Sequence, residues 1–240
     1  KRGKKRFSWE ADMRFVDTKN VPEDRTIASK VKEYEKFLKT ELDIVIGKTS
    51  TELDSRKKTV RTGEAAIGNL IADAMRDGVD ADIAIANGGG IRAKKIYAPG
   101  TSITRRDMLT EMPFGNVVVK LRLTGAQIWD ALENGVSQVE NNAGRFPQVS
   151  GLSFTYKKGV SKGSRIVSVK IGGQNLNKNR SYTVATNNYA AGGGDGYSVF
   201  KKGIVIIDES GATLLAGMVM NYIKAKGSVS PKVEGRIVAQ

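Results

Sequence analysis

The stretch "DIAIANGGGIR", residues 82–92, joins an apolar run to an amide, three glycines and a guanidinium. Residues 82–87 have the composition of a strand, and the glycines that follow are typical of a sharp turn. Residues 88–90 lack a Cβ, so their backbone can approach a ligand closely, and Arg92 can hold a phosphate with two parallel hydrogen bonds. A tight turn with a solvent-exposed arginine explains the same residues equally well.

A second segment combines a strand with a glycine-rich loop. The residues "SYTVAT" (181–186) lead directly into "NNYAAGGGDGY" (187–197). Tyr189 carries a ring that can stack on a base, and Asp195 is an acceptor suited to the paired hydroxyls of a ribose. A surface loop in which Asp195 caps a turn is the simpler alternative. Two such loops in one chain favour a ligand site, because ligand crevices in sheet proteins form where strands end.

Neither of two common phosphate-binding motifs is present. Residues 87–92 lack the G-x-G-x-x-G pattern of dinucleotide-binding folds. The stretch "GKTS" (47–50) is not a phosphate loop, because Leu42 stands where that motif needs a glycine.

Two further residues are candidates for the same site. Arg61 immediately precedes a helix predicted to begin at Thr62, so its charge and the free N–H groups of that helix could converge on one anion. Phe114 lies between Pro113 and Gly115, in a turn and not in a strand. The common alternatives are a solvent-exposed arginine and a buried phenylalanine.

Helical periodicity is present in four places: residues 26–46, 62–78, 124–136 and 214–223. We expect the first helix to have a core-facing side. Thr62 is the expected N-cap of the second helix and Gly78 its stop. Thr124 and Gln127 have the spacing of a capping box at the start of the third helix.

Strands are predicted at five places: residues 82–87, 117–123, 152–156, 165–171 and 181–186. Gly172 and Gly173 signal a turn. Strands and helices mix without strict alternation, and several neighbouring strands resemble hairpins. We therefore predict the α+β (mixed α/β) class, with a mixed β-sheet and packed helices.

The composition excludes several kinds of site. The 240 residues include no cysteine and no histidine, which excludes disulfides, thiolate or histidine metal sites and a Ser/His or Cys/His nucleophile pair. No apolar run approaches the roughly 20 residues that a membrane-spanning helix needs. The chain does not begin with Met, so we expect Lys1 to be a boundary made by processing or by the choice of fragment.

The charge is strongly positive. Lys and Arg number 39 against 25 Asp and Glu, a net charge of +14. Such an excess suits a polyanion, an anionic substrate or an ordinary basic surface. Only residues 1–6 form a dense basic run, so a solvated basic surface is favoured over nucleic-acid binding.

Six motifs occur together in a fixed order: "GNLIADAM", "NGGGIR", "PFGNVVV", "LTGAQIWDAL", "FPQVSG" and "AAGGGDGY". In this order and spacing they resemble the C-terminal domain of the 5′-nucleotidase family, over roughly residues 45–240. That family includes UDP-sugar hydrolases, 2′,3′-cyclic nucleotide phosphodiesterases and a cell-surface AMP hydrolase. The resemblance implies a nucleotide-binding domain at 47–240, a connecting helix at 26–46 and a linker from a metallophosphatase domain at 1–25.

The resemblance also implies a two-domain phosphoester hydrolase that removes phosphate from nucleotides. Its N-terminal metallophosphatase domain holds two divalent metal ions with Asp, His and Asn, and water on those metals attacks the phosphorus. A chain without histidine cannot contain that domain, so we expect this chain to bind nucleotide without hydrolysing it and to hold no metal. The family usually works outside the cytoplasm, in the periplasm or on the cell surface.

Four residues match positions of the family that hold the nucleoside. Phe114 and Tyr189 match the two aromatics that enclose a purine or pyrimidine base. Asp195 matches the carboxylate on the ribose hydroxyls, and Asn87 matches the amide that faces the nucleoside. Gly192 stands where relatives often have Asn or Thr, so no side-chain contact is expected there.

Four other residues match positions near the phosphates. Arg61 and Arg92 match the guanidiniums that hold them, and Gly89 and Gly90 match the backbone that approaches the ligand. The arginines can also stabilise the charge of the transition state. Two alternatives remain open: a basic, non-enzymatic module for nucleic acid or another polyanion, and a receptor or adhesin whose metal domain has decayed.

Overall fold

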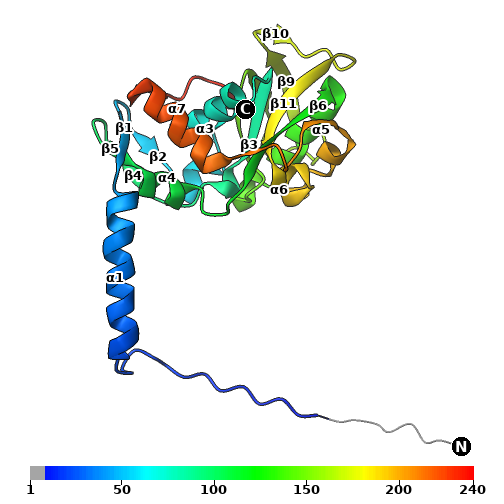
Figure 1. Cartoon of the computed structure of the whole chain (residues 1–240). Helices are drawn as coiled ribbons and strands as arrows, with labels where there is room; N and C mark the ends of the chain where they lie inside the picture. The colour runs from blue at the N-terminus through cyan, green and yellow to red at the C-terminus, as the bar shows by residue number, and fades with distance from the viewer. Residues whose placement is uncertain (1–8) are drawn as a thin grey trace, which may run out of the picture. The chain divides into compact units, whose positions relative to one another are not determined.

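The computed structural model describes residues 9–240 (Figure 1). The basic run at residues 1–6 lies outside the described residues, as does the beginning of the predicted linker. The chain divides into two compact units, Lys1–Thr40 and Glu41–Gln240.

Most of helix α1 (Arg25–Leu42) belongs to the first unit. The helix begins at Arg25 because Asp24 Oδ1 accepts hydrogen bonds from the N–H groups of Thr26 (2.9 Å) and Ile27 (3.0 Å). It ends at Leu42, earlier than predicted, because Val45 already belongs to a strand.

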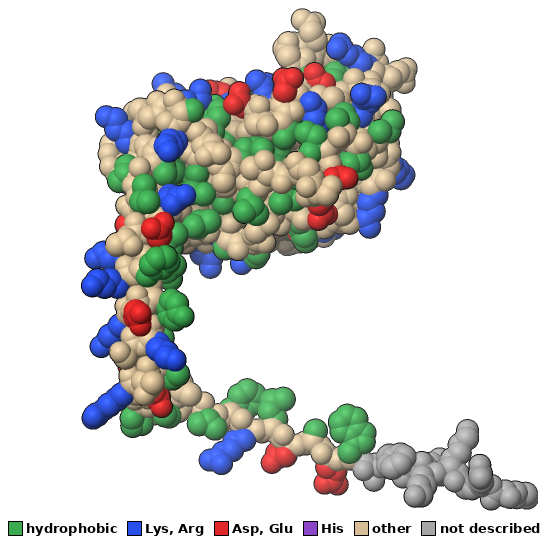
Figure 2. Space-filling view, viewed as in Figure 1, with side chains coloured by type: hydrophobic (Ala, Val, Ile, Leu, Met, Phe, Trp, Pro, Cys, Tyr) green, Lys and Arg blue, Asp and Glu red, His purple; other side chains and the backbone are tan. Residues whose placement is uncertain are grey.

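The predicted core-facing side of α1 is wrong for the residues that the structure describes, since none of the helix is buried. Most of its large apolar side chains are exposed, and they are Ile27, Val31, Tyr34, Phe37 and Leu38. Figure 2 shows hydrophobic side chains along one side of the helix and Lys and Arg along the other. The helix is therefore amphipathic, and its apolar side is exposed. No helix of residues 9–240 is long and apolar enough to span a membrane.

The centre of the second unit is a six-stranded sheet. Its order is β12 (Ile204–Ile207), β6 (Val117–Thr124), β11 (Ser181–Asn187), β3 (Ile83–Asn87) and β7 (Pro147–Ser150), with β13 (Thr213–Leu214) also paired to β6. Strands β3 and β11 are parallel and the other neighbours are antiparallel, which confirms the predicted mixed sheet. Because β3 and β11 run in the same direction, their last residues, Asn87 and Asn187, reach the same edge.

Strand β3 decides the fold because it is buried along its whole length. Successive side chains of a strand point to opposite faces. Ala84 and Ala86 pack into a core with α3 (Ala66–Gly78) and α7 (Leu215–Lys226). Ile83 and Ile85 pack into a second core with α5 (Gly125–Val136). The small residues thus lie on one face and the large ones on the other, and helices cover both.

Three smaller sheets complete the second unit. They have the orders β14 (Ser228–Val229), β1 (Val45–Thr49), β5 (Ser102–Thr104); β10 (Gln174–Asn175), β9 (Ile166–Ile171), β8 (Leu152–Tyr156), β15 (Ile237–Ala239); and β2 (Leu53–Asp54), β4 (Ile96–Tyr97). The predicted turn at Gly172 and Gly173 is confirmed, because both have positive φ and join β9 to its antiparallel partner β10.

Thr62 is not the N-cap of α3, which begins at Ala66 without a side-chain cap. The Thr62 hydroxyl instead donates to the carbonyl of Lys58 (2.7 Å), a residue of the short helix α2 (Lys57–Val60). The Ala65 N–H donates to Gln148 Oε1 (3.0 Å), so a residue from β7 satisfies the start of α3.

The capping box at the start of α5 is confirmed. Gln127 N–H donates to Thr124 Oγ1 (3.2 Å), and Thr124 N–H donates to Gln127 Oε1 (2.8 Å). The short helices, in contrast, were not predicted. Besides α2, they are α4 (Arg105–Glu111), α6 (Asn188–Ala191), and the 3-10 turns η1 (Gly88–Gly90), η2 (Val139–Asn141), η3 (Gly194–Gly196) and η4 (Ser198–Lys202).

Candidate functional site

The eight residues predicted to bind substrate line a single cavity of about 460 Å³. They are Arg61, Asn87, Gly89, Gly90, Arg92, Phe114, Tyr189 and Asp195. Asn116 and Gly144 complete the lining and were missed. Asn116 lies within the quoted motif "PFGNVVV", so the sequence near it could have indicated its place in the site. Gly144 lies in a loop between α5 and β7, and no sequence pattern there indicated a role in the site.

A ladder of polar side chains crosses the edge where β3 and β11 end. Asn187 Nδ2 donates to Asn87 Oδ1 (2.8 Å), and Asn87 Nδ2 donates to Asp195 Oδ2 (2.7 Å). Asn187 Oδ1 in turn accepts the N–H of Ala190 (2.8 Å), at the first turn of α6. Asn87 is buried, so its amide is held between protein groups and orients the carboxylate of Asp195.

Asp195 has a left-handed backbone, with φ 52° and ψ 21°. This conformation is disfavoured for residues other than glycine, although aspartate tolerates it better than most. Its carbonyl accepts from Asn134 Nδ2 (3.2 Å), and its N–H donates to Tyr189 Oη (3.2 Å). Gly193 and Gly196 on either side also have positive φ. The loop thus uses its glycines to turn Asp195 toward the cavity.

The two aromatic rings of the cavity are largely exposed. The exposed fractions are 57% for Phe114 and 48% for Tyr189, so neither ring belongs to a core. Gly194 packs against the Tyr189 ring, where a Cβ would lie 2.5 Å from Tyr189 Cζ. The Arg92 guanidinium carbon lies 5.2 Å from the centroid of the Phe114 ring. Exposed rings beside a cationic group are suited to a flat ligand that carries negative charge.

Arg61 and Arg92 bring positive charge to the cavity without carboxylate partners. Among the described residues, neither guanidinium has a carboxylate oxygen within 4.0 Å. Arg61 Nη1 reaches the Asn142 carbonyl at 3.5 Å, and its buried Nε has no partner in this part of the chain. Burial lowers the pKa of Arg61, and the charge of Arg92 lowers it further, against the attraction of Asp195. Two unpaired guanidiniums in one cavity attract an anion.

The expectation that Arg61 acts with the N-terminus of the following long helix is wrong. Arg61 follows the last residue of α2, and α3 begins at Ala66. The positive charge at this end of the cavity therefore comes from side chains.

Two of the three glycines of "NGGGIR" lie so close to other backbone segments that a side chain would not fit there. Gly88 N–H donates to the carbonyl of Phe146 (2.7 Å), and Gly89 N–H donates to the carbonyl of Gly144 (2.8 Å). A Cβ on Gly88 would lie 2.1 Å from the Val60 carbonyl oxygen, and one on Gly89 would lie 2.8 Å from Gly144 Cα. At Gly90 the nearest atom to a Cβ is Asn87 Oδ1, at 3.6 Å. Of the three glycines, only Gly90 has free space.

Buried Glu111 fixes the chain that follows Arg92. Its carboxylate accepts from Tyr97 Oη (2.9 Å) and from the Ala93 N–H (3.1 Å), while its carbonyl accepts the Arg92 N–H (2.9 Å). Burial raises the pKa of Glu111. The backbone of Arg92 is therefore anchored even though its side chain is exposed.

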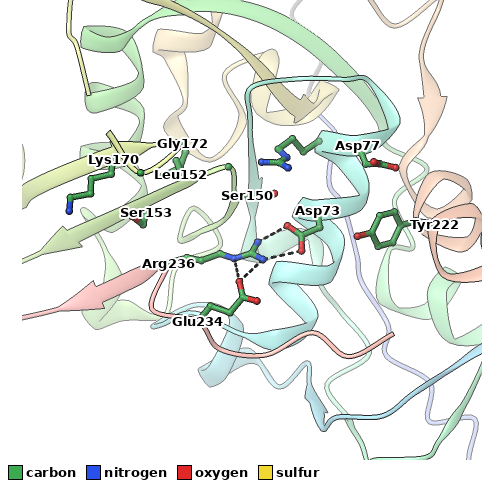
Figure 3. Close-up of a pocket in the computed structure, with 13 residues that line it drawn as sticks. Asp73, Asp77, Ser150, Leu152, Ser153, Lys170, Gly172, Tyr222, Glu234 and Arg236 are labelled. Carbon is green, nitrogen blue, oxygen red and sulfur yellow. Dashed lines mark hydrogen bonds and ion pairs between the residues drawn. The ribbon is translucent and has the colours of Figure 1, made fainter. Parts of the chain in front are cut away.

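Another depression, of about 440 Å³, has an ion-paired cluster of Arg236, Asp73 and Glu234 in its lining (Figure 3). Arg236 lies against Asp73 (2.6 Å) and Glu234 (2.8 Å), and its guanidinium also donates to the Val149 carbonyl (2.9 Å). These contacts tie the C-terminal segment to α3 and β7. The Arg236 guanidinium is thus occupied by protein groups, unlike those of Arg61 and Arg92.

Comparison with known proteins shows to which family this chain belongs. The family model described as "5'-nucleotidase, C-terminal domain" matches residues 45–202, and the chain belongs to this family.

Individual relatives and a solved structure support this family assignment. The chain is 43% identical over 202 residues to the trifunctional nucleotide phosphoesterase protein YfkN of Bacillus subtilis (strain 168), covering 80% of this chain and 14% of that protein. It is 33% identical over 196 residues to protein UshA of Escherichia coli (strain K12), covering 81% and 34%. The crystal structure of a 5′-nucleotidase precursor from Thermus thermophilus superposes with a TM-score of 0.80 at 36% identity, covering 91% and 44%. The chain spans less than half of each of these relatives.

Proposed function

We propose that this chain is the nucleotide-binding part of a 5′-nucleotidase-type hydrolase that removes phosphate from nucleotides. The observation that carries the proposal is the single cavity in which two exposed aromatic rings, a fixed carboxylate and two unpaired guanidiniums meet. These groups suit the three parts of a nucleotide: base, ribose and phosphate.

The nucleoside end of the site is proposed to lie between Phe114 and Tyr189. Stacking on an aromatic ring contributes about 1–3 kcal/mol per base and tolerates different bases, so we expect loose base selectivity. Asp195 accepts hydrogen bonds from the ribose hydroxyls. Asn87 acts through Asp195, because its amide already bonds to that carboxylate.

The phosphate end is proposed to lie at Arg61 and Arg92, with Gly89 and Gly90 as the adjoining wall. Guanidiniums hold phosphate oxygens with charge-assisted hydrogen bonds. If they retain this contact while negative charge develops on the phosphorus, they also lower the barrier to hydrolysis.

The two divalent metal ions that the family implies do not fit this part of the chain. Residues 9–240 contain no group of three or more Asp or Glu placed to hold a metal ion, and the whole sequence has no histidine. We propose that a metallophosphatase domain outside this chain holds the metals, and that this chain alone does not hydrolyse nucleotides.

The remaining segments are proposed to connect the two domains. Residues 1–25 would form the linker and 26–46 the connecting helix, of which the structure has α1 at Arg25–Leu42. The exposed apolar side of α1 is consistent with a partner elsewhere in a longer protein. We propose an extracytoplasmic location, supported by a relative named snake venom 5′-nucleotidase from Gloydius brevicauda, 30% identical over 239 residues and covering 92% of this chain and 40% of that protein.

Calorimetric titration of AMP and of adenosine into the chain tests the proposal. We expect saturable binding of both, and a loss of about tenfold or more in affinity with Phe114→Ala or Tyr189→Ala, because each removes one stacking surface. Tyr34→Ala is the matched control, since Tyr34 is an exposed aromatic on α1 that does not line the cavity. No saturable binding, or equal effects of all three variants, would contradict the proposal. Metal-dependent hydrolysis by the chain alone would contradict its inactivity.

The basic composition supports one other function, the binding of nucleic acid or another polyanion. Salt distinguishes the two, because polyanion binding weakens steeply as salt rises and the stacking of an uncharged nucleoside does not. We expect adenosine affinity to change less than about twofold between low and moderate salt. Tight, salt-sensitive binding of single-stranded DNA together with no binding of adenosine would favour the polyanion function.

A further inference from the structure

Strand β12 lies at one end of the six-stranded sheet and has an exposed apolar surface. Among the described residues it pairs only with β6. All four of its residues are apolar, and the exposed fractions of Ile204, Val205 and Ile206 are 64%, 56% and 41%. None of the four lines the candidate nucleotide cavity. The proposed function therefore does not account for this surface.

The outer side of β12 offers backbone groups to another strand. In an antiparallel pair only alternate residues of an edge strand bond to the inner neighbour. Among the described residues, no backbone group outside β6 bonds to the backbone of residues 204–207. The register with β6 shifts between Val205 and Ile207, which leaves Ile206 without a partner residue on β6. Natural edge strands are usually protected by charges or proline as well as by bulges, and β12 contains neither a charge nor a proline.

The segments on either side of β12 carry opposite charges. The sequence "KKGIVIIDE" (201–209) has two lysines before the apolar residues and two acidic residues after them. The side chains at 201–202 and 208–209 are exposed, and among the described residues none of them has an oppositely charged group within 4.0 Å. The segment is therefore basic at one end, apolar in the middle and acidic at the other end.

This order of charges indicates which partner the edge fits. When two copies of β12 pair antiparallel, the basic end of each lies beside the acidic end of the other, and a two-fold axis relates the two contacts. Parallel pairing would place lysine beside lysine and acid beside acid. Residues 201–209 thus match a second copy of themselves in one orientation only.

We propose that β12 is a dimer interface, at which the six-stranded sheets of two copies of this chain join into one continuous sheet. Strand β13 lies on the same side of β6 as β12, because β11 occupies the other side, and its residue Leu214 is 55% exposed. The apolar surface therefore continues along this edge. The proposal does not rest on nucleotide binding.

The interface is small, because β12 has only four residues. Interfaces that bury less than about 1,200 Å² in total are typical of weak complexes. We therefore expect a dissociation constant of about 1–100 μM, which sedimentation equilibrium measures over a range of about 1–300 μM chain.

Reversing the charges at one end of β12 tests the pairing. Lys201→Glu with Lys202→Glu gives two acidic ends, and Asp208→Lys with Glu209→Lys gives two basic ends. Each double variant alone should dimerise about tenfold or more weakly than the parent chain, because like charges meet. An equimolar mixture of the two should dimerise as the parent does, because opposite charges meet again.

A control variant makes the same charge change away from β12. Lys157→Glu with Lys158→Glu alters two exposed lysines in the segment after β8 and should leave the dissociation constant unchanged.

A disulfide gives a second measurement that does not depend on charge. The chain has no cysteine, so Val205→Cys introduces a single thiol in the middle of β12. Opposite residues of an antiparallel pair have Cα atoms about 4.5–5.5 Å apart, which a disulfide can span. With oxidised glutathione we expect Val205→Cys to form a covalent dimer. Val167→Cys, at a position on β9 that is 45% exposed, should remain mostly monomeric.

Three results would overturn the proposal. The parent chain could remain monomeric over the whole concentration range. The mixture of charge variants could dimerise no better than either variant alone, or both variants could dimerise as the parent does. Val205→Cys could form no more covalent dimer than Val167→Cys. Each result leaves the proposed function intact, because that function is tested by nucleotide titration.

Discussion

Asn87 Nδ2 and Asp195 Oδ2 are joined by a 2.7 Å hydrogen bond between residues 108 positions apart in the sequence. The bond links the end of β3 to the loop that follows β11 and α6. It explains why both glycine-rich segments belong to one site: the amide from the first holds the carboxylate of the second.

Removing this bond should weaken nucleoside binding. In Asn87→Ala, the Asp195 carboxylate loses its shorter hydrogen bond and keeps only the one from Tyr189 Oη (3.4 Å), while Asn187 Nδ2 loses its acceptor. A hydrogen bond to a charged group is worth about 1.5–3 kcal/mol. We expect adenosine affinity to fall about tenfold and the unfolding free energy to fall by about 1–3 kcal/mol. Titration calorimetry and urea unfolding measure the two effects. Asn141→Ala, at an exposed asparagine, should change neither, and unchanged adenosine affinity in Asn87→Ala would show that Asp195 needs no positioning.

The two cavity arginines should distinguish AMP from adenosine. Arg61→Gln and Arg92→Gln each remove a charge that has no carboxylate partner among the described residues, so each should weaken AMP by about tenfold or more and adenosine by less than about threefold. Arg76→Gln makes the same charge change outside the cavity and should leave the ratio of the two affinities unaltered. An equal loss for both ligands would mean that the arginines do not contact phosphate.

The glycines of η1 should differ in their tolerance of alanine. Gly88→Ala places a methyl group 2.1 Å from the Val60 carbonyl oxygen, whereas Gly90→Ala places one 3.6 Å from Asn87 Oδ1. We expect Gly88→Ala to lower the unfolding free energy by about 1–3 kcal/mol or more, and Gly90→Ala to stay within about 0.5 kcal/mol. Urea unfolding measures both. Equal stabilities would show that the Val60 backbone moves aside without cost.

Acid should loosen the turn that carries Arg61. Hydrogen bonds from Arg56 lower the pKa of Asp54 from 3.8 to about 2, with a further bond from the Thr59 hydroxyl. Because the folded pKa is depressed, this contribution to stability is present above pH 3.8 and is lost as the pH falls toward about 2. We expect Asp54→Asn to lower stability at neutral pH and to reduce the loss on acidification through this window. Urea unfolding at several pH values tests this, with Asp130→Asn at an exposed position as control. An unaltered pH profile in Asp54→Asn would contradict it.

The sequence predicted an element correctly where the residues that define it are close together in the chain. The Thr124–Gln127 capping box closes through bonds between residues three apart, and β3 was visible as an apolar run ending in glycines. Six of the eight candidate site residues gather in one cavity because the parallel strands β3 and β11 end at one edge, as expected of strand-to-glycine loops. Arg61 and Phe114 reach the same cavity from the end of α2 and from the turn before β6.

The features that the sequence did not predict depend on contacts with residues far away in the chain. Val45 continues the apolar period of α1, but β1 pairs with β5 and β14, which lie far along the chain, and the strand takes precedence. The start of α3 is set by Gln148, and no pattern near Thr62 contains that information. Gly144 lines the cavity because its loop bonds to Gly89, a contact between residues separated by two helices and several strands.

The hydrogen bonds that Gly88 and Gly89 give to Phe146 and Gly144 have a thermodynamic consequence. They make one wall of the cavity depend on β7, while the other walls depend on α2, β6 and β11. No single segment retains a binding surface when the others unfold, so ligand binding and folding are linked equilibria. A ligand at about 100 times its dissociation constant should stabilise the second unit by about 2.7 kcal/mol, and its melting temperature becomes a quantitative assay of nucleotide affinity.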